Sequence, residues 1–196
     1  MFIVQSKFKM TGGKIANNTA TQNGGGVLYY YAASGIVTLG GIAKITGNVT
    51  GGSIVRGTLV GGTPNNVHLV NDKYIQLGTG ADEPKSGMSV GITTATAPTE
   101  NNPVTISAIC TQPDYATYFF ADNSDYCVGY ENDVLKLGCV YPLCVGGVQV
   151  TRFNKDDVFG VTDGDGATVS YDDATHTLTL NNATIARTDE VGANNE

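Results

Sequence analysis

Tryptophan is absent from the 196 residues, and charged residues make up only 15% of them. No apolar run is longer than a few residues, which argues against a membrane-spanning helix because such a helix needs about 20 apolar residues. No stretch shows the 3.6-residue apolar period of an amphipathic helix. Hydrophobic residues still reach 41%, enough for a core and too many for a disordered chain. Together with 26 glycines, these absences favour an all-β protein of short strands and tight turns.

Basic residues are scarce in the second part of the chain. Residues 1–109 hold seven Lys or Arg against four acidic residues, whereas residues 110–196 hold four against fourteen. A composition break of this size predicts two units, which we place at residues 1–142 and 143–196. The acidic second unit argues against nucleic acid as a partner, because phosphate recognition requires clustered Lys and Arg.

The cysteines lack the spacing of a metal site. Cys110, Cys127, Cys139 and Cys144 form no C-x-x-C pair, and only two histidines are present to complete a zinc site. We therefore predict no metal ligand and no cofactor. Four thiols allow three pairings, and the sequence leaves open whether they are reduced or bridged.

The first residues do not read as a signal peptide. Residues 1–8 lack a basic segment, a long apolar stretch and a small-residue cleavage site. We therefore expect that, if the protein acts outside the cell, this sequence is a piece of a longer chain.

What the sequence does contain is an echo at an interval of thirty residues. Residues 13–19 read GKIANNT and residues 43–49 read AKITGNV, so that Lys, Ile and Asn return in the same order. Short β-runs that return at a fixed interval between Gly and Asn are typical of a stacked coil, in which each turn contacts its neighbours.

This pattern predicts which side chains face inward. Ile15 and Ile45 should stack in one buried column. Asn18 and Asn48 should occupy equivalent turns, where an Asn side-chain amide can bond either to the backbone or to the Asn one rung above. In residues 67–69, alternation places the valine and the leucine inward and the histidine outward.

The residues that carry the echo resemble a known family. Residues 10–27 contain MTGGKIANNTA and NGGGV, which resemble the GG-x-I-x-x-N-T-A and N-GGGV rungs of right-handed parallel β-helix (pectate-lyase-like) surface proteins of gut Firmicutes and relatives. Residues 39–48 look like the next rung. Residues 66–77 and 90–94 are similar to that family's closing rungs. The resemblance covers roughly residues 8–138 and implies a right-handed parallel β-helix over residues 1–142.

The end of this helix and the tail carry resemblances of their own. Residues 115–125 and 135–137 look like the segment that finishes the helix in that family. We expect the open end of the coil to be covered by Tyr115, Tyr118, Phe119 and Phe120. Residues 168–185 resemble the opening of a carbohydrate-binding-type β-repeat, which implies a small β unit over residues 143–196. In that unit Leu178 and Leu180 would face a core.

One aromatic cluster is the candidate ligand site. Tyr29, Tyr30 and Tyr31 follow one another in the basic part of the chain, and Lys14 and Lys44 are expected to form a column on neighbouring strands. Tyrosine faces would stack on sugar rings while the ammonium groups attract sulfate or uronate. These five residues therefore predict weak, salt-sensitive binding to acidic glycans. A plain packing role for the tyrosines is the alternative.

The sequence lacks the equipment of polysaccharide-cleaving enzymes. Lyases on such folds need a carboxylate cluster for Ca²⁺ and a cationic base, and hydrolases need paired carboxylates. No expected strand in residues 1–109 places two carboxylates on one face. Asp163 and Asp165 indicate an Asp-Gly hairpin turn, because the spacing of an EF-hand is not met. We therefore predict that the protein is not an enzyme.

The predicted function is that of a non-catalytic module of an extracellular, bacterial cell-surface protein, acting in adhesion or glycan binding. Its localisation follows from the resemblance alone. Its partners would be glycans or host surface proteins, with no membrane span in this chain. The alternatives are a polysaccharide lyase or hydrolase on a β-helix and a purely structural stalk.

Overall fold

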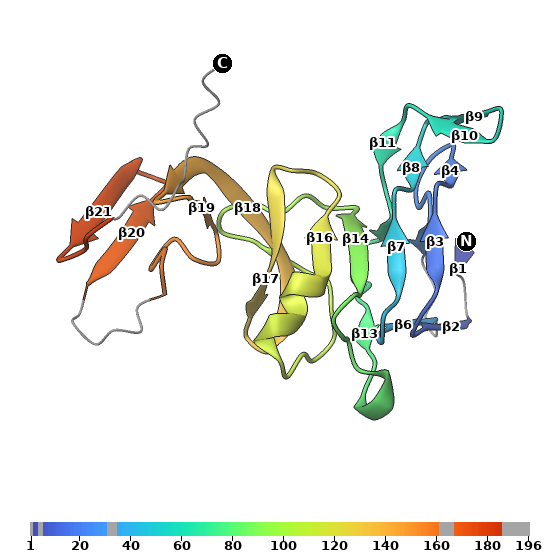
Figure 1. Ribbon diagram of the computed structural model, residues 1–196, viewed down its shortest axis with the longest axis horizontal. Coiled ribbons are helices and arrows are strands. Elements are labelled where there is room, and N and C mark those ends of the chain that lie inside the picture. The colour runs from blue at the N-terminus through green and yellow to red at the C-terminus, as the bar shows by residue number, and fades with distance from the viewer. Residues whose placement is uncertain (1, 4–5, 31–34, 161–166, 186–196) are drawn as a thin grey trace, which may run out of the picture. The chain divides into compact units, whose positions relative to one another are not determined.

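The computed structural model describes residues 2–3, 6–30, 35–160 and 167–185 and shows an all-β protein (Figure 1). Strands account for 48% of the chain and helix for 5%, which confirms the predicted class. The chain forms two compact units, Met1–Gly138 and Cys139–Glu196. This division lies a few residues before the expected boundary at residues 142 and 143.

Two parallel sheets organise the first unit. The long sheet contains β1 (Phe2–Ile3), β3 (Lys14–Ala16), β5 (Val27–Tyr29), β7 (Lys44–Thr46), β12 (Val67–Leu69), β14 (Ser89–Thr94) and β16 (Phe119–Ala121). The short sheet contains β2 (Lys7–Met10), β6 (Ile36–Leu39) and β13 (Gln76–Leu77). The chain enters the two sheets in turn, with β2 before β3, β6 before β7 and β13 before β14. Each such passage, which we call a rung, stacks in parallel on the rung before it.

The thirty-residue echo is a pair of stacked strands. β3 and β7 pair in parallel with Lys14 opposite Lys44 and Ile15 opposite Ile45, as the sequence predicts. Ile45 is fully buried, whereas Ile15, on the outermost strand of the long sheet, is only partly buried. The stacked isoleucines therefore share one column, and only the second has neighbours on both sides.

In each of the first two rungs, the chain leaves the long sheet after one strand and returns to it in a second strand, from β3 to β5 and from β7 to β12. The third rung crosses the sheet as one strand, β14, which pairs with β7 at Ser89 and with β12 at Ile92. In the second rung, residues 47–66 leave the sheet between β7 and β12, and we call them the excursion. The excursion contains β8 (Val49–Thr50), β9 (Ser53–Val55), β10 (Thr58–Val60) and β11 (Thr63–Pro64). β8 joins β11 and β4 (Thr19–Ala20) in a small sheet at one end of β3 and β7 (Figure 1).

The core of the first unit is built from inward side chains of both parallel sheets. It includes Val37 and Leu39 from β6 and Ile45, Val67 and Val90 from the long sheet, each at most 1% exposed. Strand alternation explains this selection, because every second side chain of a strand points to the same face.

The residues after β14 form an aromatic segment, which includes β16, and an antiparallel sheet. Phe119 is part of the core, and Tyr115 and Tyr118 of the 3₁₀ helix η2 (Pro113–Tyr118) pack against it. Phe120 differs from the expectation: it is 38% exposed, because alternation turns its side chain away from the core side occupied by Phe119. The antiparallel sheet contains β15 (Val104–Thr105), β17 (Tyr126–Glu131), β18 (Val134–Val145) and β19 (Val148–Thr151). A second short 3₁₀ helix, η1, covers Gly80–Asp82.

The second unit has a small core of its own. Tyr141, Val145, Val150, Val158 and Val169 are buried together. β20 (Thr168–Asp172) and β21 (Thr177–Asn181) form an antiparallel hairpin, and its expected inward residue Leu178 packs against this core. The expectation for Leu180 is wrong, since this side chain is 47% exposed; β21 pairs only with β20 among the described residues, so little covers it.

Two further expectations concern the cysteines and the Asp-Gly turn. The structure contains no disulfide among Cys110, Cys127, Cys139 and Cys144, in line with the reduced alternative that the sequence leaves open. The Asp-Gly turn expected at Asp163 and Asp165 lies outside the described residues.

Candidate functional site: an outward groove beside an amide ladder

A ladder of hydrogen bonds joins residues that lie just outside the strands of the long sheet, after β3 and β7, before β12 and after β16. The backbone N–H and the Nδ2 of Asn18 both donate to Oδ1 of Asn48, at 3.1 and 2.8 Å. The same two groups of Asn48 donate to Oδ1 of Asn66, both at 2.9 Å. Asn66 in turn donates to both carboxylate oxygens of Asp122, at 2.6 and 2.5 Å. Asn18 and Asn48 thus occupy equivalent turns, as predicted, and their side-chain amides bond both to the backbone and to the next asparagine. Asn66 and Asp122 extend this amide ladder by two members.

The turns that hold the ladder use left-handed residues directly before the asparagines. Asn17 has a φ of 58° and Gly47 a φ of 68°, a region that Asn and Gly tolerate better than other residues. These two residues occupy equivalent positions one rung apart, since the Asn17 N–H donates to the Gly47 carbonyl at 3.2 Å. The ladder asparagines are thereby free to use their side chains for stacking.

Two glycines leave room for the amide ladder. A Cβ on Gly91 of β14 would lie 2.3 Å from Oδ1 of Asp122 and 2.4 Å from Nδ2 of Asn66. A Cβ on Gly26 would lie 2.9 Å from Nδ2 of Asn48. Any larger residue at these positions would therefore displace the ladder.

His68 lies beside the amide ladder and is buried. Its register partner is Thr93, whose hydroxyl donates to Oδ2 of Asp122 at 2.7 Å. The His68 side chain is 5% exposed, and its Nδ1 has no hydrogen-bond partner in the described part of the chain. Burial lowers the pKa of His68, and the negative charge of Asp122 offsets this only in part. The position that alternation assigns to the outward face is thus not exposed to solvent.

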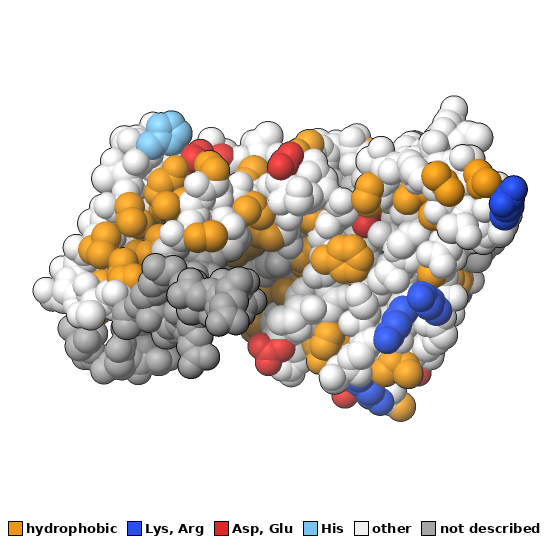
Figure 2. Space-filling view, turned by 45° about the horizontal axis from the view of Figure 1, so that its top comes forward, with side chains coloured by type: hydrophobic (Ala, Val, Ile, Leu, Met, Phe, Trp, Pro, Cys, Tyr) orange, Lys and Arg blue, Asp and Glu red, His pale blue; other side chains and the backbone are white. Residues whose placement is uncertain are grey.

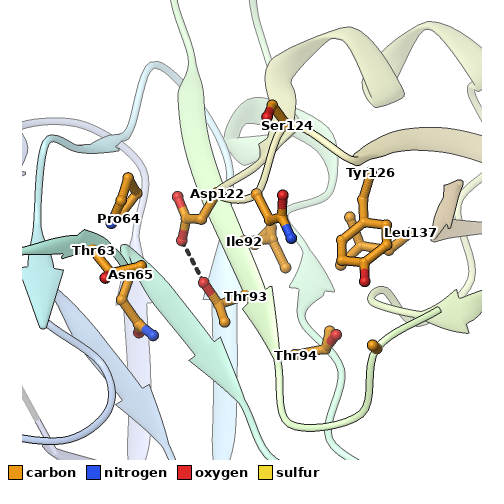
Figure 3. Close-up of a pocket in the computed structure, with 12 residues that line it drawn as sticks. Thr63, Pro64, Asn65, Ile92, Thr93, Thr94, Asp122, Ser124, Tyr126 and Leu137 are labelled. Atoms are coloured by element: carbon orange, nitrogen blue, oxygen red, sulfur yellow. Dashed lines mark hydrogen bonds between the residues drawn. The ribbon is translucent and has the colours of Figure 1, made fainter. Parts of the chain in front are cut away.

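Beside Asp122 the surface is hollowed into a groove of about 590 Å³. One wall comes from the excursion and the other from the turn after β16, while β14 forms the floor (Figure 3). The groove is lined by Thr63, Pro64, Asn65, Ile92, Thr93, Thr94, Ala97, Asp122, Asn123, Ser124, Tyr126 and Leu137. Its position depends on the excursion, because the first wall exists only where residues 47–66 leave the sheet.

The groove combines one aromatic ring with neutral polar groups. Tyr126 and Leu137 line the same part of the groove (Figure 3), where they provide apolar surface and a phenol hydroxyl. Asn65 and Asn123 use their Oδ1 atoms to accept bonds from the N–H groups of Gly24 and Asp125, at 2.8 and 2.9 Å, so their Nδ2 groups are available as donors. Threonine and serine hydroxyls add further donors and acceptors.

Asp122 is the one charged residue among the described lining residues of the groove. Its two oxygens already accept three hydrogen bonds, two from Asn66 and one from Thr93. These bonds compensate the carboxylate and fix its position between the ladder and the groove. The groove can therefore exchange hydrogen bonds with a neutral ligand, but it offers no cation to an acidic one.

The structure separates the site residues that the sequence places together. Lys14 and Lys44 form the expected column and are exposed. Tyr29, however, is buried at 5% exposure and donates its hydroxyl to the Gly35 carbonyl. Tyr30 is 47% exposed, and Tyr31 lies outside the described residues.

The register of the long sheet shows how far Lys14 and Lys44 lie from Tyr29. Lys44 lies opposite Ser89 at the start of β14, whereas Tyr29 lies opposite Leu69, which in turn lies opposite Thr94 at its end. This places the lysines roughly 16 Å from Tyr29 along the sheet, at ~3.3 Å per residue. The cation over the Tyr29 ring is instead Lys73, 5.9 Å from the ring centre. A glycan-binding role for the five predicted residues stays a prediction.

The groove residues could not be predicted from the sequence, and the reason is physical. Tyr126, Asn123 and Asn65 come from segments that the thirty-residue echo does not reach, and their proximity depends on a stack of rungs of unequal length. The available signal was the run Thr63-Pro64-Asn65-Asn66, which reads as a turn. Nothing in it indicates that Asn66 joins the ladder.

Comparison with known proteins adds no relative to this description: no family model, no curated protein and no solved structure matches the chain. Among the described residues, no three His, Cys, Asp or Glu side chains gather into a possible metal site. No helix in the described residues has the length and apolar character needed to cross a membrane.

Proposed function

We propose that this chain is a non-catalytic, glycan-binding module of an extracellular bacterial surface protein. The observation that carries the proposal is the groove, where the Tyr126 ring lies among hydroxyl and amide groups without a Lys or Arg in the described lining. Aromatic faces stack on sugar rings, and hydroxyl and amide groups exchange hydrogen bonds with sugar hydroxyls. The ligand that fits this chemistry is a neutral glycan.

We further propose that the first unit is a right-handed parallel β-helix. Three features support this: the parallel, in-register stacking of β3 on β7, the alternation of two parallel sheets along the chain, and the amide ladder. The glycine and asparagine pattern of residues 10–27 supports the same architecture through its resemblance to bacterial surface proteins. That resemblance also supports the extracellular localisation.

Binding suits the groove better than hydrolysis. Glycoside hydrolases place two carboxyl groups about 5 to 10 Å apart, one of them ready to give a proton. Asp122 is the single carboxylate of the described lining. A proton on Asp122 would also weaken the three hydrogen bonds that its charge strengthens, from Asn66 and Thr93.

A glycan array with the isolated protein, followed by calorimetric titration of the ligands found, tests the proposal. We expect neutral glycans to bind with an affinity that changes little with salt, because the groove contributes no cation. Tyr126→Ala should weaken binding about fivefold, since stacking on an aromatic ring contributes on the order of 1 kcal/mol. The matched control is Tyr74→Ala, which removes a tyrosine that is 49% exposed and does not line the groove.

Other results would contradict this site. Binding that survives Tyr126→Ala but is lost in Lys44→Ala and at high salt would return the site to the lysine column. If no glycan binds the correctly folded protein, a spacer role explains the molecule better. Turnover of any polysaccharide would show that the protein is an enzyme.

A further inference from the structure

The first rung leaves three strands paired on one side only. β3 is the last strand of the long sheet, β2 of the short sheet and β4 of the small sheet. Each pairs with the corresponding strand of the second rung, namely β7, β6 and β8. Among the described residues, these three edges are therefore open on the same side of the stack. On that side only β5 has a partner, β1.

A trough of about 580 Å³ lies at the open edge of β3. It is lined by the whole of β3 together with Asn18, Thr19, Gly25 and Gly26. Its volume falls within the ~300–1,000 Å³ that ligand sites occupy. Ile15 at its base is partly exposed, whereas Ile45, which has a strand on both sides, is fully buried. A further strand over β3 would give Ile15 the cover that Ile45 already has.

The amide ladder also ends at this edge with an unused acceptor. Oδ1 of Asn48 and Oδ1 of Asn66 each accept two bonds, one from a backbone N–H and one from an Nδ2. Asn18 donates in the same way, but within the described residues no N–H or Nδ2 donates to its own Oδ1. The group that would complete the pattern is another asparagine in an extended segment.

We propose that the β3 edge binds an extended polypeptide segment, which adds a parallel strand to the long sheet. The segment places an aliphatic side chain over Ile15 and, three residues later, an asparagine over Asn18. This is the spacing that stacks Ile45 and Asn48 on the other side of β3. Main-chain hydrogen bonds at a sheet edge supply affinity, and the side-chain positions supply specificity.

Charge restricts the residue that precedes the aliphatic one. Lys14 and Lys44 already stand directly opposite each other and are exposed. On the face seen in Figure 2, Lys and Arg side chains are spread over the right-hand part of the view. Like charges on paired positions repel, whereas opposite charges attract. The bound segment therefore carries an acidic or neutral residue opposite Lys14.

A synthetic peptide tests this site directly. Its sequence is that of residues 41–50 with Lys44→Glu, so it contains the aliphatic residue, the asparagine and the acid in the required order. In amide NMR spectra of the protein at millimolar peptide, we expect shift changes confined to β3 and its neighbours, and slower hydrogen exchange at Ile15 and Ala16. A matched peptide that also carries Asn48→Ala should bind about fivefold more weakly, the effect of one to two hydrogen bonds.

A charge exchange provides the second arm. Lys14→Glu on the protein should reverse the preference, so that the peptide with the natural lysine binds about two to five times better than the glutamate peptide. The proposal is overturned if β3 amides do not respond to the peptide, or if the Asn48→Ala peptide binds equally well. It is also overturned if sedimentation shows that the protein alone forms a dimer that protects the same amides, because the edge would then serve a second copy.

Discussion

Asn66 binds Asp122 through both of its donors: the backbone N–H to Oδ2 at 2.6 Å and Nδ2 to Oδ1 at 2.5 Å. The two residues are 56 positions apart in the chain, and the pair joins the end of the excursion to the turn that follows β16. Because Thr93 donates to the same carboxylate, Asp122 connects three segments of the first unit.

Asp122→Ala should therefore lower the stability of the protein. It leaves the N–H and Nδ2 of the nearly fully buried Asn66 without acceptors, and each unsatisfied buried group costs about 1–3 kcal/mol. Urea melts measure the effect. Asp125→Ala removes an exposed acid from the same turn and should change the midpoint little. Equal losses in both variants would mean that the bonds of Asp122 do not stabilise the fold.

Gly91→Ala should destabilise the protein although it adds only a methyl group. The new Cβ would lie well inside contact distance of Asp122 and Asn66, and overpacking of this kind costs roughly 1–3 kcal/mol. The control is Gly12→Ala, where the nearest atom to the new Cβ is 3.7 Å away. Thermal unfolding of the two variants compares them. A stable Gly91→Ala protein would show that the ladder can shift without loss.

The isoleucine column predicts unequal effects of equal changes. Ile45→Ala should cost about 2–5 kcal/mol, as is usual for a fully buried aliphatic residue. Ile15→Ala should cost clearly less, because its side chain is only partly buried. Denaturant melts of both variants give the comparison, and a loss under about 0.5 kcal/mol for Ile45→Ala would remove it from the core.

His68 predicts a loss of stability in mild acid. Its pKa in the folded protein lies below the ordinary value of about 6.5, so below that pH the unfolded chain binds a proton that the folded protein does not. The free energy of unfolding should thus be unaffected by this group above pH ~6.5 and decrease as the pH falls toward the folded-state pKa.

Urea melts of His68→Gln on either side of pH ~6.5 check this expectation, because the variant should lose that part of the pH dependence. His176→Asn is the control: it removes the second histidine, which is exposed in the turn before β21 and has a left-handed φ of 51° that asparagine tolerates. If His68→Gln keeps the full pH dependence, another group is responsible for it.

The sequence predicted the part of the fold that repeats. The stacking of Lys14, Ile15 and Asn18 on the second rung could be predicted because Lys44, Ile45 and Asn48 follow them at the same interval of thirty residues. The ladder bonds to Asn66 and Asp122 break this interval, since they span 18 and 56 residues. Their partners are set by how far the chain travels outside the sheet, which local patterning does not encode.

The same interruption explains why the predicted tyrosine and lysine site is not assembled. Lys14 and Tyr29 belong to one rung, but residues 17–26 leave the sheet between β3 and β5. Alternation does not decide whether Tyr29 lies on the inner or the outer face of β5. The register of β5 with β12 and β1, together with the core contacts, shows that it faces the core. The groove was likewise beyond the sequence, because the excursion builds one of its walls.

The pair of bonds between Asn48 and Asn66 closes the excursion at its base, and this makes its length independent of the stack. The entropy of closing a loop rises by only about 0.6 kcal/mol for each doubling of its length, while both ends stay clamped to fixed positions of the long sheet. Descendants of such a chain can exchange the residues between β8 and β11 for shorter or longer ones without changing the packing of the core, because β9 and β10 pair only with each other among the described residues. The protein thus combines an excursion whose sequence can vary with a stack of strands whose sequence is constrained by packing.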